Sequence, residues 1–151
     1  MIKKIIFLFF GAVLLWSCAT VPFIQRESSI KSVVELINTG NHAKLSELSE
    51  IPFLLDGEII VMPGDVSFFW ETALKNGLSI SGYTIESVGP PDAGDSAVFS
   101  ESREIAMFFA KYVPEDSSIA KIKASSGTFY LLLNGKEGKY PRIIGFKGDG
   151  A

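Results

Sequence analysis

The fold class is decided by one segment, 63-PGDVSFFWETALKNGLSISGYTIES-87, within which the spacing of the apolar residues changes. As far as Leu74 the apolar residues recur every three or four positions, which predicts a helix that Asp65 caps and Gly77 ends. Beyond Gly77 apolar and polar residues alternate, and the alternation changes phase at Gly82, which predicts strands with a bulge. A chain that changes from helices to strands in this way is expected to be an α+β protein.

Two helices are expected before this segment, the second of them short. Ser28 or Ser29 can cap the first, and Gly40 ends it. Its apolar residues are spaced as one helical stripe: Ile30, Val33, Val34 and Ile37. Asn41 can cap the second helix, which Pro52 ends.

Strands are expected on both sides of the central helix. The segment 53-FLLDGEIIVM-62 predicts a strand pair or a bent strand with its turn at Asp56-Gly57. Downstream, 128-TFYLLL-133 is a strand, Asn134-Gly135 begins a hairpin loop, and 140-YPRIIGF-146 returns. Residues 119–124 form a short strand or a turn of helix, and 89–95 form a loop by composition.

The segment 103–113 allows two interpretations. Ile105, Phe108, Phe109 and Tyr112 fit a helical stripe, but the segment is rich in aromatic residues and ends at Pro114. We favour a strand buried on both faces, with a helix as the alternative.

The predicted order is two helices, a short strand or hairpin, a third helix and then three or four antiparallel strands. It predicts a curved antiparallel sheet packed against about three helices. The chain resembles the cystatin-like cone fold of the nuclear-transport-factor-like superfamily in four parts: the amphipathic pair 29–50, the strand FLLDGEI, the helix DVSFFWETAL and the closing hairpin. The resemblance implies a conical pocket between sheet and helices, used by some members for catalysis and by many for binding.

The first eighteen residues indicate where the protein is located. Lys3 and Lys4 are followed by an uncharged apolar run, 5–16, that is too short to span a bilayer but suits the apolar region of a signal peptide. The next positions complete the sequence Leu15-Trp16-Ser17-Cys18, which resembles the lipobox of bacterial lipoproteins. The resemblance implies cleavage between Ser17 and Cys18 and attachment of acyl chains such as palmitate at Cys18.

Cys18 is the only cysteine of the chain, and lipidation would explain an unpaired cysteine in an exported protein. The alternatives are an ordinary signal peptide with an incidental cysteine, or an uncleaved anchor. The expected organisation is a signal peptide (1–17), a lipidated cysteine with a short tether (18–28) and a single α+β domain (29–151). The protein is then anchored in the cell envelope, on the extracytoplasmic side of the inner or outer membrane.

The composition narrows the classes of partner. Lys3 and Lys4 belong to the signal, so 12 of the 14 basic residues remain against 17 acidic ones. This balance excludes nucleic acid as an expected partner, because such proteins usually carry a basic face. The membrane is expected to be contacted through the lipid on Cys18.

Few residues suggest catalysis, and no cofactor or metal is expected. His42 is the only histidine, and one His without a spare Cys cannot fill a typical zinc site. Asp56 is a weak candidate for a catalytic carboxylate because apolar residues surround it in the sequence, and burial would raise its pKa. The simpler interpretation, which we favour, is that Asp56-Gly57 forms a turn.

Aromatic residues suggest binding instead. Trp70 on the central helix, with Tyr83, Phe108 and Tyr130 on expected strands, would line an apolar pocket if the core leaves one open; the alternative is that they fill the core. The sequence thus favours a membrane-anchored, non-enzymatic binding module for a small apolar ligand or an envelope protein partner. The alternatives are a small isomerase-like or hydrolase-like enzyme that uses Asp56, and a purely structural surface lipoprotein.

Overall fold

The computed structural model describes residues 21–135 and 140–149. The elements in those ranges are α1 (Val21–Asn38), α2 (His42–Leu48), β1 (Ser49–Leu55), β2 (Glu58–Ile60), α3 (Pro63–Lys75), β3 (Thr84–Gly89), α4 (Asp95–Phe99), α5 (Arg103–Tyr112), β4 (Ser118–Ala124), β5 (Gly127–Leu133) and β6 (Ile143–Asp149). The expected signal peptide and the lipobox with Cys18 lie outside the described residues.

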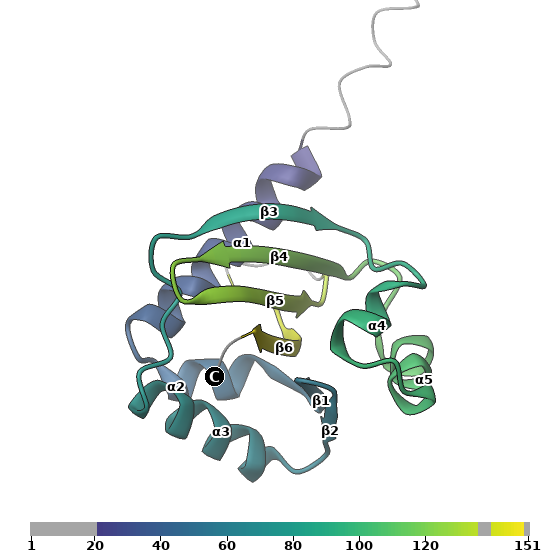
Figure 1. Cartoon of the computed structure of the whole chain (residues 1–151), viewed down its shortest axis with the longest axis horizontal. Coiled ribbons are helices and arrows are strands. Elements are labelled where there is room, and N and C mark those ends of the chain that lie inside the picture. The colour runs from purple at the N-terminus through teal and green to yellow at the C-terminus, as the bar shows by residue number, and fades with distance from the viewer. Residues whose placement is uncertain (1–20, 136–139, 150–151) are drawn as a thin grey trace, which may run out of the picture.

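The six strands form one sheet in the order β2-β1-β6-β5-β4-β3 (Figure 1). Neighbouring strands are antiparallel except for β1 and β6, which run parallel. The α+β class is therefore confirmed, but the sheet is mixed instead of antiparallel throughout. The parallel pair consists of β1 and β6, because β6 is inserted between β1 and β5. The antiparallel expectation missed it, because local alternation carries no information about such long-range pairing.

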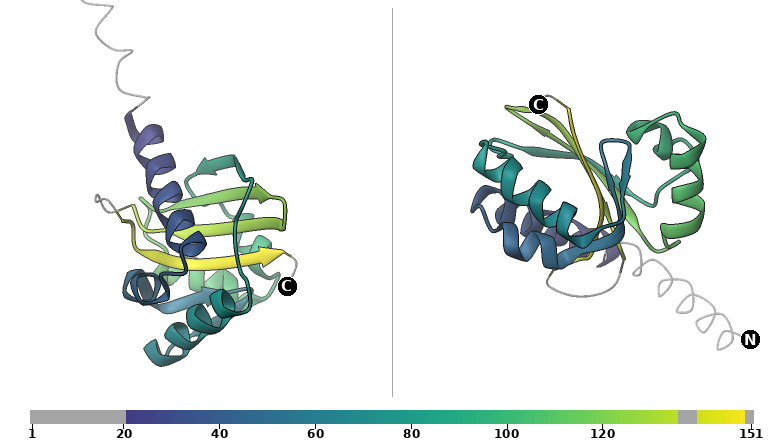
Figure 2. Two further views of the ribbon diagram at one scale, coloured as in Figure 1. Left: turned by 90° about the vertical axis from the view of Figure 1, so that its left-hand side faces the viewer. Right: turned by 90° about the horizontal axis from the view of Figure 1, so that it is seen from below.

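Helices cover both faces of the sheet (Figure 2). The three expected helices, α1 to α3, pack on one face, while α4 and α5 form a second layer on the other. Successive strand residues therefore contact different layers. Leu131 packs in the core beneath α1–α3, and Leu132 packs in the core beneath α4 and α5.

Helix α3 confirms the expectation for the central segment, although it begins earlier. Met62 is its N-cap, Pro63 occupies the first turn and Asp65 lies within that turn instead of capping it. Proline favours this start because the first N–H groups of a helix need no intrahelical partner. Trp70 is fully buried on the inner face of α3, and its Nε1 donates a hydrogen bond of 3.0 Å to Ser49 Oγ.

The preference for a strand over 103–113 was wrong, because residues Arg103–Tyr112 form α5. Ser102 caps the helix, and its hydroxyl accepts a hydrogen bond of 3.2 Å from the backbone N–H of Ile105. The apolar stripe that includes Ile105 and Phe108 packs against the sheet. Local capping and helical spacing thus outweigh the strand preference of aromatic residues.

Helix α1 begins at Val21, so the segment expected as a short tether (18–28) is helical from that residue. Pro22 is compatible with the helix because it lies in the first turn. The short helix α4 was not expected within the loop-rich region after Gly89. Residues 78–83, expected to contain strand, form no strand, and Gly82 adopts a φ of 60° there.

Candidate functional site

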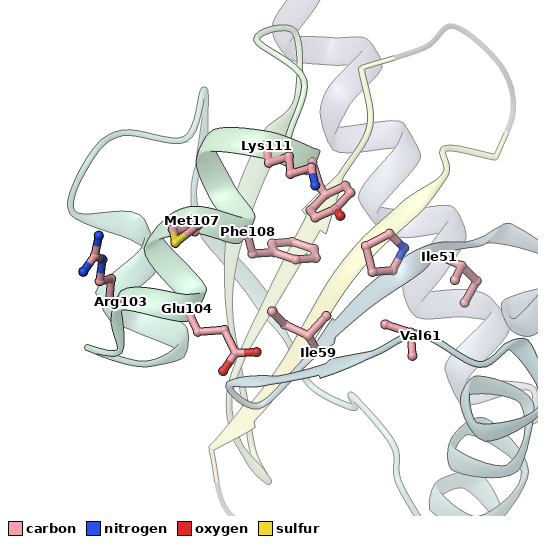
Figure 3. A pocket seen from close by; sticks show the side chains of 10 residues that line it. Ile51, Ile59, Val61, Arg103, Glu104, Met107, Phe108 and Lys111 are labelled. Atoms are coloured by element: carbon pink, nitrogen blue, oxygen red, sulfur yellow. The ribbon is translucent and has the colours of Figure 1, made fainter.

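A trough lies between α5 and the β1–β2 hairpin, on the sheet face opposite α1–α3 (Figure 3). Its volume is about 590 Å³, within the range of ordinary ligand sites. We call it the α5 trough. Its lining residues are Ile51, Pro52, Ile59, Val61, Arg103, Glu104, Met107, Phe108, Lys111 and Tyr112.

The walls of the α5 trough expose an unusual amount of apolar surface. Val61 and Met107 are 62% and 61% exposed, and Ile51 and Tyr112 are each 41% exposed. Phe108 forms a fully buried floor. Most of the large apolar side chains that the described residues leave exposed thus gather at one hollow, and such a concentration marks an interaction site more often than isolated exposed residues do.

The hairpin wall of the trough is shaped by its two-residue turn. Asp56 and Gly57 have φ values of 47° and 101°, as a type I′ hairpin turn requires. The Asp56 carboxylate accepts a hydrogen bond of 2.9 Å from the Gly148 N–H, which fixes the turn to β6. The turn interpretation of Asp56-Gly57 is therefore confirmed, and the Asp56 carboxylate lies at the exposed tip and not among the trough-lining residues.

The tip of the hairpin also contacts the connection between α4 and α5. A Cβ atom on Gly57 would lie 2.9 Å from the backbone oxygen of Phe99 and 3.1 Å from Ser100 Cβ. Lys147 on β6 connects the end of α4 to the sheet, because its Nζ donates a hydrogen bond of 2.7 Å to the Val98 carbonyl. These contacts set the spacing between the two walls at the end of the trough where α5 begins.

Replacing Gly57 by Ala is expected to destabilise the protein by about 2–4 kcal/mol, because a positive φ and a backbone collision act together. Gly77→Ala is the matched control: Gly77 has a φ of 93°, but no atom lies within 4 Å of a Cβ there. Urea unfolding measures both variants. Equal losses for the two would show that the contact between the hairpin tip and Phe99 adds nothing to stability.

Charged residues lie at both ends of α5 along the trough. Glu104 is in the first helical turn and Lys111 in the last, positions that the helix dipole favours for these signs of charge. Figure 3 shows the Glu104 side chain directed toward the hairpin, with Lys111 at the other end and Arg103 pointing away. The Lys111 Nζ lies 5.0 Å from the centroid of the Tyr112 ring.

The four aromatic residues selected from the sequence do not meet at one pocket. Trp70 and Tyr83 pack in the core beneath α1–α3, whereas Phe108 and Tyr130 pack on the opposite sheet face. Among them only Phe108 lines the α5 trough.

The exposed apolar residues of the trough, such as Val61 and Met107, were not selected from the sequence. An apolar residue near the end of the hairpin pattern 53–62 and a methionine off the helical stripe were the available signals, but neither indicates a site without the position of α5.

A second hollow of about 520 Å³ lies along another side of α5. It is lined by Pro91, Asp92, Ala93, Ser96, Ala106, Phe109, Ala110, Val113, Pro114 and Glu115. Its residues come from the loop before α4, from α4, from α5 and from the segment after α5, and none of them belongs to the α5 trough.

The described ranges hold neither a metal-type cluster of side chains nor a membrane-spanning helix. Nowhere in residues 21–135 and 140–149 do three or more His, Cys, Asp or Glu side chains gather as a metal site would require. Among the helices of the same ranges, none has both the length and the apolar character needed to cross a bilayer. His42 is exposed at the start of α2.

Comparison of the chain with protein-family models, curated proteins and solved structures finds no match.

Proposed function

We propose that this chain is a lipoprotein of the bacterial cell envelope whose α+β domain binds an apolar partner in the α5 trough without catalysing a reaction. The observation that supports binding is the gathering of exposed apolar side chains from β1, from Val61 just after β2 and from α5 around one hollow. Burial of such surface by a partner is favourable by roughly 25 cal/mol per Å².

The proposal of an envelope location rests on the N-terminal sequence. A short apolar run follows Lys3 and Lys4, and the only cysteine, Cys18, stands where a lipobox requires it. Lipidation at Cys18 would hold the domain close to the membrane surface. The partner would then be a small apolar molecule or another protein of the same envelope.

The assignment to the cystatin-like cone is part of the same proposal. It is supported by the order of the first elements: two helices, a hairpin and a third helix that precede the antiparallel strands. The packing of α1–α3 on one sheet face also agrees with it. The space between these helices and the sheet is filled by core side chains that include Trp70, so the binding site is proposed on the other face.

Photo-crosslinking in cells tests binding at the trough. A photoreactive amino acid at position 107, in place of Met107, is expected to give a specific crosslinked product of the full-length protein. The same amino acid at position 71 is the control, because Glu71 is exposed on α3, away from the trough. The product is expected to decrease at least about tenfold in a Val61→Asp variant, because a charge in an apolar contact is costly to bury.

Since Val61 is mostly exposed, Val61→Asp is expected to leave the free energy of unfolding within about 0.5 kcal/mol of the parent protein. The mass of the crosslinked product separates a small molecule from a protein. Identical products from positions 107 and 71, or a product at 107 that Val61→Asp does not reduce, would contradict a binding function for the trough.

A further inference from the structure

The outer edge of β2 has backbone groups available for a further strand. β2 is the first strand in the sheet order and pairs only with β1. Leu55 pairs with Glu58 across the two-residue turn, so the backbone groups of Glu58 and Ile60 face β1 and those of Ile59 face outward. Within the described residues, no partner bonds to the outward N–H and C=O of Ile59.

The same residue joins this free edge to the α5 trough. The Ile59 side chain lines the trough and packs with the core beneath α4 and α5. An extended chain paired with β2 would direct every second side chain toward the trough, because side chains alternate between the two faces of a sheet. Strand addition of this kind combines backbone hydrogen bonds with pockets for alternate side chains.

The charges of α5 give the trough a direction. Glu104 and Lys111 are seven positions apart, which corresponds to roughly 10 Å along a helix. Neither forms an ion pair within the described part of the chain. In an extended chain, residues two positions on either side of a central residue lie on the same face about 13 Å apart. Their side chains can therefore reach both ends of α5.

From these observations we infer that the α5 trough binds an extended peptide segment of an envelope protein, added as a strand to β2. Its central apolar side chain lies over Phe108, and the residues two positions before and after it carry opposite charges that pair with Glu104 and Lys111. The inference rests on the proposed binding function and names the class of partner. A lipid acyl chain fits less well, because it would bury the Ile59 backbone groups without hydrogen bonds.

Two synthetic peptides of equal composition test the inference on the full-length protein in lipid nanodiscs. Each has seven residues, blocked ends and threonine at the odd positions, because threonine favours an extended backbone. The first has aspartate, leucine and lysine at positions two, four and six, and the second exchanges the aspartate and the lysine. Binding is measured by fluorescence anisotropy, with empty nanodiscs as the blank.

For a strand that adds to β2 in one direction, one peptide meets attraction at both ends of the trough and the other meets repulsion, so the parent protein is expected to prefer one peptide by about fivefold or more. The double variant Glu104→Lys, Lys111→Glu is expected to reverse the preference. The exchange Glu71→Lys, Lys75→Glu on α3 is the matched control and is expected to leave it unchanged. The preferred peptide is also expected to slow hydrogen exchange of the backbone at residues 58–61.

Equal affinity for the two peptides, no binding at millimolar concentration, or unchanged exchange at 58–61 would overturn the inference. A fatty acid that binds the trough and leaves exchange at 58–61 unchanged would overturn it as well, and would assign the trough to lipid. The crosslink from position 107 separates the two proposals: if it forms and the peptides fail, the binding function stands and only the class of partner is wrong.

Discussion

Replacing Trp70 by Ala is expected to lower the free energy of unfolding by about 3–5 kcal/mol. Trp70 is fully buried and lies among rings from three elements, with centroid distances of 6.2 Å to Phe53, 4.8 Å to Phe69 and 5.3 Å to Phe146. Alanine would leave a cavity between α3 and the sheet and would remove the hydrogen bond to Ser49. A small domain has roughly 5–15 kcal/mol in total, so the variant is expected to be marginal.

Urea unfolding followed by far-ultraviolet circular dichroism measures this loss. Phe68→Ala is the matched control, because it removes an aromatic ring from the same helix at a position that is 69% exposed. It is expected to change stability by about 0.5 kcal/mol or less. Trp70→Phe keeps most of the ring volume and removes the Nε1 donor, so a loss of about 1–2 kcal/mol is expected. This variant replaces Trp70→Ala in the measurement if the alanine variant cannot be purified. Similar stabilities for Phe68→Ala and Trp70→Ala would contradict the packing described for α3.

Replacing Cys18 by Ala is expected to abolish lipid attachment completely, because the thiol is the only group of the chain that can form the thioether. Cells that express the parent protein in labelled palmitate are expected to yield a labelled band at the size of the protein, and the variant is expected to yield none. One acyl chain binds a membrane only marginally, whereas several chains make anchoring effectively permanent. Release of the Cys18→Ala domain from the membrane fraction is therefore a second measure of lipid attachment.

Ser28→Ala is the control for this experiment, since it alters an exposed residue beyond the lipobox and is expected to keep the label. A parent protein without label would support an ordinary signal peptide or an uncleaved anchor. The two differ in fractionation: an anchored chain stays with the membranes after Cys18→Ala, and a chain with an ordinary signal peptide is soluble with or without the substitution.

Several elements that depend mainly on local sequence were predicted correctly. Helix α3 follows from its apolar spacing and from Pro63 in its first turn. The β1–β2 hairpin follows from Asp56-Gly57, because both residues adopt the positive φ that the turn needs. Asn41 was expected to cap α2, and its side chain accepts a hydrogen bond from the Lys44 N–H at 3.1 Å.

The candidate site was less accessible from the sequence, because it depends on two segments far apart in the chain. Phe108 was selected as an apolar pocket residue and does line the α5 trough, but it was placed on the wrong element, since a strand was favoured over 103–113. With α5 taken as a strand, nothing indicated that Val61 and Met107 would line opposite walls of one trough. Exposure of an apolar side chain is a tertiary property, and periodicity alone cannot separate it from burial.

The position of β6 has a consequence for how a newly made chain acquires its structure. Among the described residues β6 follows all the other strands in sequence, yet it joins the β1–β2 hairpin to the block formed by β3, β4 and β5. Before β6 has been made, no strand is present that can link those two groups by backbone hydrogen bonds. A nascent chain therefore cannot complete its sheet before residues Ile143–Asp149 have emerged. Until then its unpaired strand edges are exposed to pairing with other chains.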